Sequence, residues 1–210
     1  MTVDLQTRID AAVECNVAPD EYFSLWDEFA EWQLDALKTI GMKPQHKLLD
    51  FGCGAFRLGL GAIQYLDDGN YYGIDAFDPY IEIGKKLVAA AKIQKKFTAL
   101  ASTDFEFEKL GAQFDYGNAQ SVFTHMSGEE CDRCMAALKK AMVRGGSFFF
   151  TYLIGAPITR GMLYLGAQPM QRFAMNDPKF FAALASRHGA SFEPVDIKHL
   201  TGQHVAMFRF

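Results

Sequence analysis

The sequence lacks any long apolar run. None of its segments approaches the ~20 consecutive apolar residues that cross a bilayer. Residues 1–5 show neither a basic segment nor an apolar one, so nothing indicates a signal peptide. Cysteine is also scarce, and its four positions do not have the spacing of a secreted disulfide scaffold. These absences favour a cytoplasmic protein that does not bind membranes.

Basic residues are not in excess. The 210 residues hold 21 Lys and Arg against 25 Asp and Glu, for a net charge of −4. A nucleic-acid-binding surface usually needs clustered Lys and Arg, so no nucleic-acid partner is expected. Internal repeats and Pro/Gly/Ser-rich linkers are absent from the sequence as well. We therefore predict one domain over residues 1–210, with a substantial core.

Strand-like and helix-like segments alternate along the chain. Helical spacing of apolar residues predicts a helix over 21–40, within an N-terminal helical cap of residues 1–42. The predicted strands are 47–51, 71–75, 97–107, 114–122, 147–153, 192–200 and 204–210. The alternation is typical of an α/β fold with a mostly parallel sheet and helices on both faces. We expect a Rossmann-like seven-stranded sheet whose last strand is antiparallel.

Three connections deserve separate predictions. Arg144-Gly145-Gly146 is expected to end the helix that precedes the fifth strand. Thr201-Gly202-Gln203 is short enough to join the last two strands as a hairpin. Residues 154–176 contain proline, glycine and methionine without a clean period. An irregular segment of that length in a compact domain usually means a lid or substrate loop.

The turn Asp50-Phe51-Gly52-Cys53-Gly54, which follows the first strand, is the most informative segment. Ligands of such sheets bind outside the carboxyl ends of the strands. Two glycines let backbone approach a ligand closely, and the helix that begins near Arg57 points its free amides into the same space. A tight turn that binds nothing remains the alternative, because such a motif is weak on its own.

Asp75 and Arg57 narrow the choice of ligand. Asp75 ends the second strand 21 positions after Gly54, where an acid can accept hydrogen bonds from ribose hydroxyls. The dinucleotide-binding motif Gly-x-Gly-x-x-Gly would have its third glycine at the position of Arg57. The sequence therefore shows no pyrophosphate-binding site. S-adenosylmethionine has no phosphate. Its amino-acid group and sulfonium cation suit a polar backbone loop with nearby carboxylates.

Four segments together resemble the motifs of class I S-adenosylmethionine-dependent methyltransferases. Leu48–Gly54 looks like the first motif and Tyr72–Asp75 like the second. Ala119–His125 is similar to the segment after the fourth strand in many small-molecule members. Met142–Phe148 resembles a helix-turn-strand segment of the family, and the match covers roughly residues 45–210. The chain departs from the family at Phe56, where a third glycine is common.

The resemblance implies a set of residues that bind S-adenosyl-L-methionine. Those around its methionine part would be Asp50, Gly52, Cys53, Gly54, Gln120 and Ser121, with Arg57 as a further candidate. Those around its adenosine would be Asp75 for the ribose and, beside the adenine, Ala76, Phe77, Asp104 and Phe105. Two aromatic residues of the N-terminal helix would close over the cofactor: Tyr22 and Trp26.

His125 is the histidine that the predicted elements bring nearest to the catalytic face, and it is the candidate catalytic residue. It could take a proton from an acceptor hydroxyl or amine, or it could only orient the loop that enters the next helix. The other histidines are expected on the surface or on strands: His46, His188, His199 and His204. Cys131 and Cys134 form a pair without a second pair, so no metal site is expected.

These observations predict an enzyme that transfers a methyl group from S-adenosylmethionine to a small-molecule acceptor. Whether oxygen, nitrogen or carbon receives the methyl group is left open, as is the oligomeric state. Two alternatives remain. One is a catalytically inactive S-adenosylmethionine-binding regulatory or partner protein. The other is an NAD-dependent oxidoreductase, which Arg57 disfavours.

Overall fold

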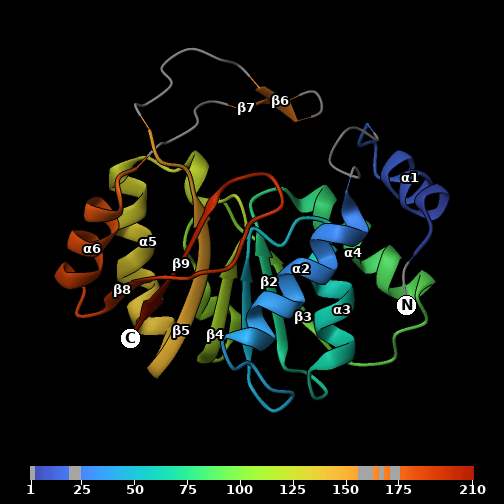
Figure 1. Cartoon of the computed structure of the whole chain (residues 1–210). Helices are drawn as coiled ribbons and strands as arrows, with labels where there is room; N and C mark the ends of the chain where they lie inside the picture. Colours follow the sequence, from blue (N-terminus) through green and yellow to red (C-terminus); the bar gives the residue numbers. More distant parts are fainter. Residues whose placement is uncertain (1–2, 19–24, 156–162, 166–167, 171–175) are drawn as a thin grey trace.

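A seven-stranded sheet forms the centre of the molecule (Figure 1). The computed structural model describes residues 3–18, 25–155, 163–165, 168–170 and 176–210. The strand order is β3-β2-β1-β4-β5-β9-β8, and β9 runs in the direction opposite to the other six strands. The strands are β1 Leu48–Phe51, β2 Tyr71–Asp75, β3 Thr98–Ala101, β4 Phe114–Ala119, β5 Met142–Tyr152, β8 Ser191–Pro194 and β9 His204–Arg209. The predicted fold class is confirmed.

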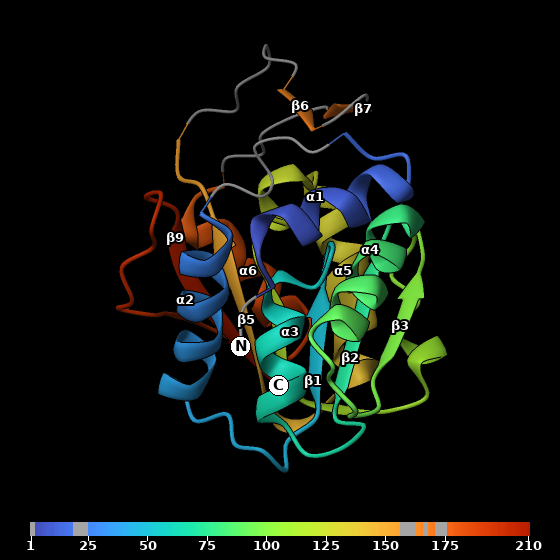
Figure 2. The ribbon, with the colours of Figure 1, turned by 90° about the vertical axis from the view of Figure 1, so that its right-hand side faces the viewer.

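Helices cover both faces of the sheet (Figures 1 and 2). On one face lie α2 Trp26–Thr39, α3 Arg57–Tyr65 and α4 Asp78–Ala90, and α1 Leu5–Glu14 packs on α4. On the other face lie α5 Gly128–Ala141 and α6 Pro178–Arg187, together with the short 3-10 helices η2 Phe107–Leu110 and η3 Phe123–His125. The sheet is therefore the middle of three layers.

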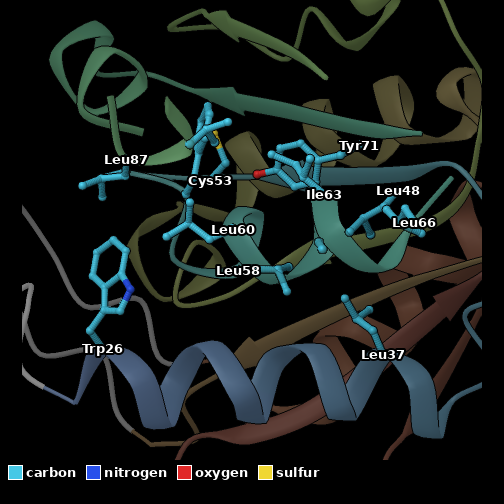
Figure 3. Close-up of a cluster of buried hydrophobic side chains, with 14 of the residues drawn as sticks. Trp26, Leu37, Leu48, Cys53, Leu58, Leu60, Ile63, Leu66, Tyr71 and Leu87 are labelled. Atoms are coloured by element: carbon cyan, nitrogen blue, oxygen red, sulfur yellow. The ribbon is translucent and has the colours of Figure 1, made fainter. Parts of the chain in front are cut away.

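Two apolar clusters fill the space between the layers. Neighbouring residues of a strand point to opposite faces, so Leu48 packs into the α2–α4 side and Leu49 into the α5–α6 side. Figure 3 shows the first cluster, which includes Leu37 of α2, Ile63 of α3 and Leu48 of β1. Burial of these side chains fixes both helices on the strand that leads into the glycine turn.

Several boundaries differ from the prediction. The strand predicted over 97–107 covers only Thr98–Ala101, and the strand predicted over 114–122 ends at Ala119. The helix predicted over 21–40 begins at Trp26, and α1 precedes it as a separate helix that the periodicity did not reveal. The helix predicted to reach Gly146 ends at Ala141 instead. Met142 already pairs with Phe114 in the sheet, and the glycines lie at an irregularity inside β5. The last two strands are joined by residues 195–203, not by a three-residue turn, because β8 ends at Pro194.

Residues 154–176 are only partly described. β6 Leu163–Leu165 and β7 Gln168–Met170 pair antiparallel in a ladder separate from the main sheet. Most of the remaining segment lies outside the described residues, so its role as a lid stays a prediction. Within the described part of the chain, no helix has both the length and the apolar character needed to span a membrane.

Candidate functional site

A cavity of about 590 Å³ opens beside the turn that follows β1. Its walls come from the carboxyl ends of β1, β2 and β4 and from the loops after them. β1 lies between β2 and β4, so the chain changes direction across the sheet here, and ligands of α/β proteins bind at such a place. The lining includes these residues singled out from the sequence: Asp50, Gly52, Cys53, Gly54, Arg57, Asp75, Ala76, Asp104, Phe105, Gln120, Ser121 and His125.

The glycine turn needs its glycines. Gly52 and Gly54 have φ of +72° and +51°, a left-handed conformation that costs little without a Cβ. A Cβ on Gly52 would also lie 2.4 Å from Cγ2 of Val122. The amides of Gly52 and Cys53 donate to the carbonyl of Ile74 at 2.8 and 3.2 Å. The turn is thus fixed against β2, with open space for a ligand above it.

Phe56 takes the position where a third glycine is common, and the structure explains how it fits. Its backbone keeps a left-handed conformation, with φ of +63°, as the residue that caps α3. Its side chain is fully buried, and its ring contacts those of Tyr71 and Phe97. Gly59 and Gly84 make the room: a Cβ on either would come within 2.7 Å of a Phe56 side-chain atom. The buried ring of Phe56 therefore stabilises the glycine turn from the side of the core.

Asp75 joins the glycine turn to the turn after β2. One carboxylate oxygen, Oδ2, accepts from the amide of Gly54 at 2.8 Å, and Oδ1 accepts from the amide of Phe77 at 2.9 Å. Burial raises the pKa of Asp75, and the hydrogen bonds from backbone amides oppose that rise. Each oxygen keeps a second lone pair. The side chain can hold both turns and still accept hydrogen bonds from a ligand.

Asp50 is a buried carboxylate in the cavity wall. The Tyr71 hydroxyl donates to its Oδ2 and the Asn118 amide donates to its Oδ1, both at 2.8 Å. Desolvation raises the pKa of Asp50 to about 6 in spite of these two hydrogen bonds. A cation placed in the cavity would favour the ionised form and lower this pKa again.

Arg57 and Gln33 form the wall on the α2 side. The guanidinium of Arg57 lies over the Phe29 ring, 4.6 Å from its centroid, and its Nε donates to Gln33 Oε1 at 3.4 Å. Gln33 is only 3% exposed and lines the cavity. Gln33 was not among the predicted site residues, although a polar residue on the apolar stripe of α2 was a usable signal.

Two of the predicted aromatic residues are not among the residues that line the cavity. Trp26 does not line the cavity: its ring lies under the Arg8 guanidinium and points toward Leu60 and Leu87 in Figure 3. Phe77 is 36% exposed and packs edge-on against Tyr80, which lines the cavity instead. Both misplacements arise because sequence spacing gives the element but not the direction of the side chain. Tyr22 lies outside the described residues.

On the opposite wall, Asp104 and Phe105 follow β3 in the loop that leads to η2. Asp104 accepts from Arg133 at 2.6 Å on the surface, and the guanidinium of Arg133 lies over the Phe105 ring. Phe105 also packs edge-on against Phe51 of β1. This wall offers an aromatic face and a carboxylate.

The segment after β4 supplies the remaining wall. Ser121 has φ of +59°, an uncommon conformation for a residue with a side chain. Its amide donates to Thr151 Oγ1 at 2.8 Å and its carbonyl accepts from Thr124 Oγ1 at 2.8 Å. His125 follows on η3, half-buried, and Ser127 then starts α5 with the predicted capping box. Strained backbone held by its surroundings is common at functional sites.

His199 was expected on the surface or on a strand, and this is wrong. The side chain is 3% exposed and lies in the long connection between β8 and β9, against Phe29 and Trp32 of α2. Burial and the nearby charge of Arg57 lower the pKa of His199 to about 4, so the ring is neutral at physiological pH. Hydrophobic periodicity could not reveal a histidine buried by a loop.

The cysteine pair shows no sign of metal chemistry. Cys131 and Cys134 are buried in the α5 core, and burial raises the pKa of both thiols. A buried thiol with a raised pKa is unreactive. Among the described residues, no group of three or more potential ligands is suited to hold a metal ion.

No protein-family model matches the chain. An uncharacterized protein of Rickettsia prowazekii (strain Madrid E) is 32% identical over 120 residues, 55% of this chain and 47% of that protein. The chain thus spans about half the length of this curated relative.

Solved structures give a broader match. The magnesium protoporphyrin IX methyltransferase of Synechocystis with bound S-adenosylhomocysteine has a TM-score of 0.64 at 15% identity, with coverage of 97% of this chain and 93% of that one. PKMT2 of Rickettsia typhi in complex with S-adenosylhomocysteine is 27% identical over 60% of this chain and 26% of its own, with a TM-score of 0.52. The chain therefore has the fold of class I S-adenosylmethionine-dependent methyltransferases.

Proposed function

We propose that this protein binds S-adenosyl-L-methionine in the cavity beside the glycine turn and transfers its methyl group to a small-molecule acceptor. One observation carries the proposal: the charge of the lining. The described lining residues include four carboxylates and one guanidinium, namely Asp50, Asp75, Asp104, Glu130 and Arg57. Asp104 is also paired with Arg133, which leaves Asp50, Asp75 and Glu130 against Arg57. S-adenosylmethionine brings a sulfonium and an ammonium cation, which such a lining attracts. The pyrophosphate of NAD would meet mainly negative charge.

The residues present fit the parts of this cofactor. The free lone pairs of Asp75 suit the two ribose hydroxyls, and Phe105 and Asp104 suit the adenine ring and its amino group. The backbone of Gly52 to Gly54 would hold the methionine part, next to Asp50. The Synechocystis and Rickettsia typhi proteins of the same fold carry S-adenosylhomocysteine, which supports this choice of ligand.

When bound, the cofactor supplies a methyl group activated by the positive sulfur. The protein would contribute chiefly by holding the two reactants in line and by excluding water. We assign to His125 the proton released by an acceptor hydroxyl or amine, since its side chain lines the cavity just after β4. Residues 154–176 are proposed to cover the acceptor. The net charge of −4 disfavours a nucleic-acid acceptor.

A transfer assay tests this function. Methyl-labelled S-adenosylmethionine is incubated with the protein and with separated small-molecule and macromolecular fractions of a cell extract. Label is expected in the small-molecule fraction. A His125→Asn variant is expected to lose about 10²–10⁴-fold in rate if the acceptor must be deprotonated. The same variant should bind S-adenosylhomocysteine as the wild type does.

The matched control is His204→Asn, because His204 is exposed and does not line the cavity. Label confined to macromolecules would contradict a small-molecule acceptor. Binding of S-adenosylhomocysteine without transfer to either fraction would favour the second candidate, an inactive S-adenosylmethionine-binding regulatory or partner protein. An unchanged rate in His125→Asn would remove His125 from the chemistry.

A further inference from the structure

The connection between β8 and β9 brings His199 to the back of the cavity wall. Its ring centroid lies 4.8 Å from that of Trp32, edge-on, and 5.5 Å from that of Phe29. The indole of Trp32 also donates to the carbonyl of Lys198 at 2.9 Å. Residues 195–203 are thus held against α2, and the imidazole has one fixed orientation.

The hydrogen bonds of His199 define its tautomer. Its Nδ1 accepts from the backbone amides of Thr201 and Gln203, at 3.1 and 3.3 Å. A ring nitrogen that accepts from amides carries no proton, so the proton of the neutral ring is on Nε2. His199 therefore presents an N–H donor on the side away from its own loop.

That donor meets the side-chain amide of Gln120. The amide atom assigned as Nε2 lies 2.8 Å from His199 Nε2 and 3.0 Å from Ser121 Oγ, while Oε1 is buried without a partner among the described residues. Two N–H groups facing each other at 2.8 Å would repel. The two atoms of an amide are nearly equal in shape, so the hydrogen-bond network decides which is which. The carbonyl oxygen of Gln120 must face His199.

With the amide in this orientation, the contacts of Gln120 with His199 and Ser121 each pair a donor with an acceptor. Gln203 Nε2 donates to Ser121 Oγ at 2.8 Å. The Ser121 hydroxyl can then donate to the Gln120 carbonyl oxygen, which also accepts from His199. The remaining Gln120 atom is then the buried amide nitrogen, and Gln120 is a residue that lines the cavity. An oxygen of a ligand in the cavity can accept from this donor.

We infer that His199 is a positioning residue that holds Gln120 as a hydrogen-bond donor to an oxygen of the bound ligand. Under the proposed function, on which this part of the inference rests, that oxygen belongs to the carboxylate of the cofactor's amino-acid group. Arg57 supports a carboxylate here, since it also lines the cavity and its positive charge acts on His199. His199 would thus orient the Gln120 amide toward the ligand without contacting the ligand itself.

Calorimetric titration with S-adenosylhomocysteine and with 5′-methylthioadenosine, which lacks the amino-acid group, tests the donor. Gln120→Glu keeps an oxygen toward His199 and puts a second oxygen where the donor was. It is expected to weaken S-adenosylhomocysteine binding by about 10–100-fold and to leave 5′-methylthioadenosine within about twofold. If Gln120 instead turned its oxygen to the ligand, this variant would bind S-adenosylhomocysteine nearly as the wild type does, and the inference would be overturned.

His199→Phe tests the positioning role. The phenyl ring keeps the packing against Phe29 and Trp32 but has no N–H, so the Gln120 amide is no longer fixed. S-adenosylhomocysteine affinity is expected to fall by about 3–30-fold, again without an effect on 5′-methylthioadenosine. His204→Phe, an exposed residue at the start of β9, is the matched control and should bind both compounds normally. Equal losses for both compounds in His199→Phe would mean a structural role only.

Nitrogen-15 NMR of the wild-type histidine rings gives a readout that needs neither variant nor cofactor. The expected result is a His199 ring protonated on Nε2, and a ring protonated on Nδ1 would overturn the inference. Absence of S-adenosylhomocysteine binding to the wild type would contradict the proposed function and the carboxylate assignment together. The NMR result would then still test the His199–Gln120 geometry.

Discussion

Replacement of Phe56 by alanine is expected to lower the free energy of unfolding by about 3–5 kcal/mol. The side chain is fully buried, and Gly59 and Gly84 leave a space that a methyl group cannot fill. Phe56→Gly should lie within about 1 kcal/mol of the alanine variant. Glycine relieves the left-handed backbone but gains freedom in the unfolded chain, and these two effects nearly cancel.

Denaturant unfolding followed by circular dichroism measures this effect. Phe77→Ala is the control, because Phe77 is 36% exposed and stands on the rim of the same region. Its loss should stay well below that of Phe56→Ala. A loss below about 1 kcal/mol for Phe56→Ala would contradict the view that the ring supports the turn. A gain in stability for Phe56→Gly would show that the left-handed backbone, and not the cavity, dominates.

Replacement of Asp75 by alanine is expected to weaken S-adenosylhomocysteine binding by about 1.5–3 kcal/mol, or roughly 10–150-fold. The variant loses the proposed acceptor for the ribose and both hydrogen bonds that join the turns at Gly54 and Phe77. Asp75→Asn should fall in between. Its amide nitrogen would face one of the two backbone N–H groups, since both carboxylate oxygens accept from such groups.

Calorimetry with two ligands separates the two contributions. If only the contact with the ribose is lost, the binding of S-adenosylhomocysteine and of 5′-methylthioadenosine would weaken by the same factor. Loosening of the glycine turn, which would hold the methionine part, would weaken S-adenosylhomocysteine more. Asp78→Asn is the control because Asp78 is exposed at the start of α4. Unchanged affinity in Asp75→Ala would mean that the ribose lies elsewhere.

The sequence predicted the fold and the cavity wall formed by the ends of the strands. Short apolar runs indicate strands, and the carboxyl ends of the strands of a parallel sheet lie at one edge. Gly52 and Gly54 follow β1, Asp75 ends β2 and Ser121 follows β4, so their places at this edge could be expected before the structure was known.

Residues contributed by packing could not be placed in this way. The direction of Trp26 depends on how α2 sits on α3, whereas Gln33 reaches the cavity from the same helix. The position of His199 depends on a connection whose length was misjudged, because β8 is shorter than its apolar pattern suggested. Tertiary packing, and not the local sequence pattern, determines these positions.

The most direct measurement of the central claim is calorimetric titration of the wild-type protein with S-adenosylmethionine, S-adenosylhomocysteine and NAD. One binding site is expected for each of the first two compounds, and none for NAD. At 100 times its dissociation constant, S-adenosylhomocysteine is expected to add about 2.7 kcal/mol to the free energy of unfolding. The melting temperature should therefore rise. Binding of NAD without binding of either S-adenosyl compound would contradict the account.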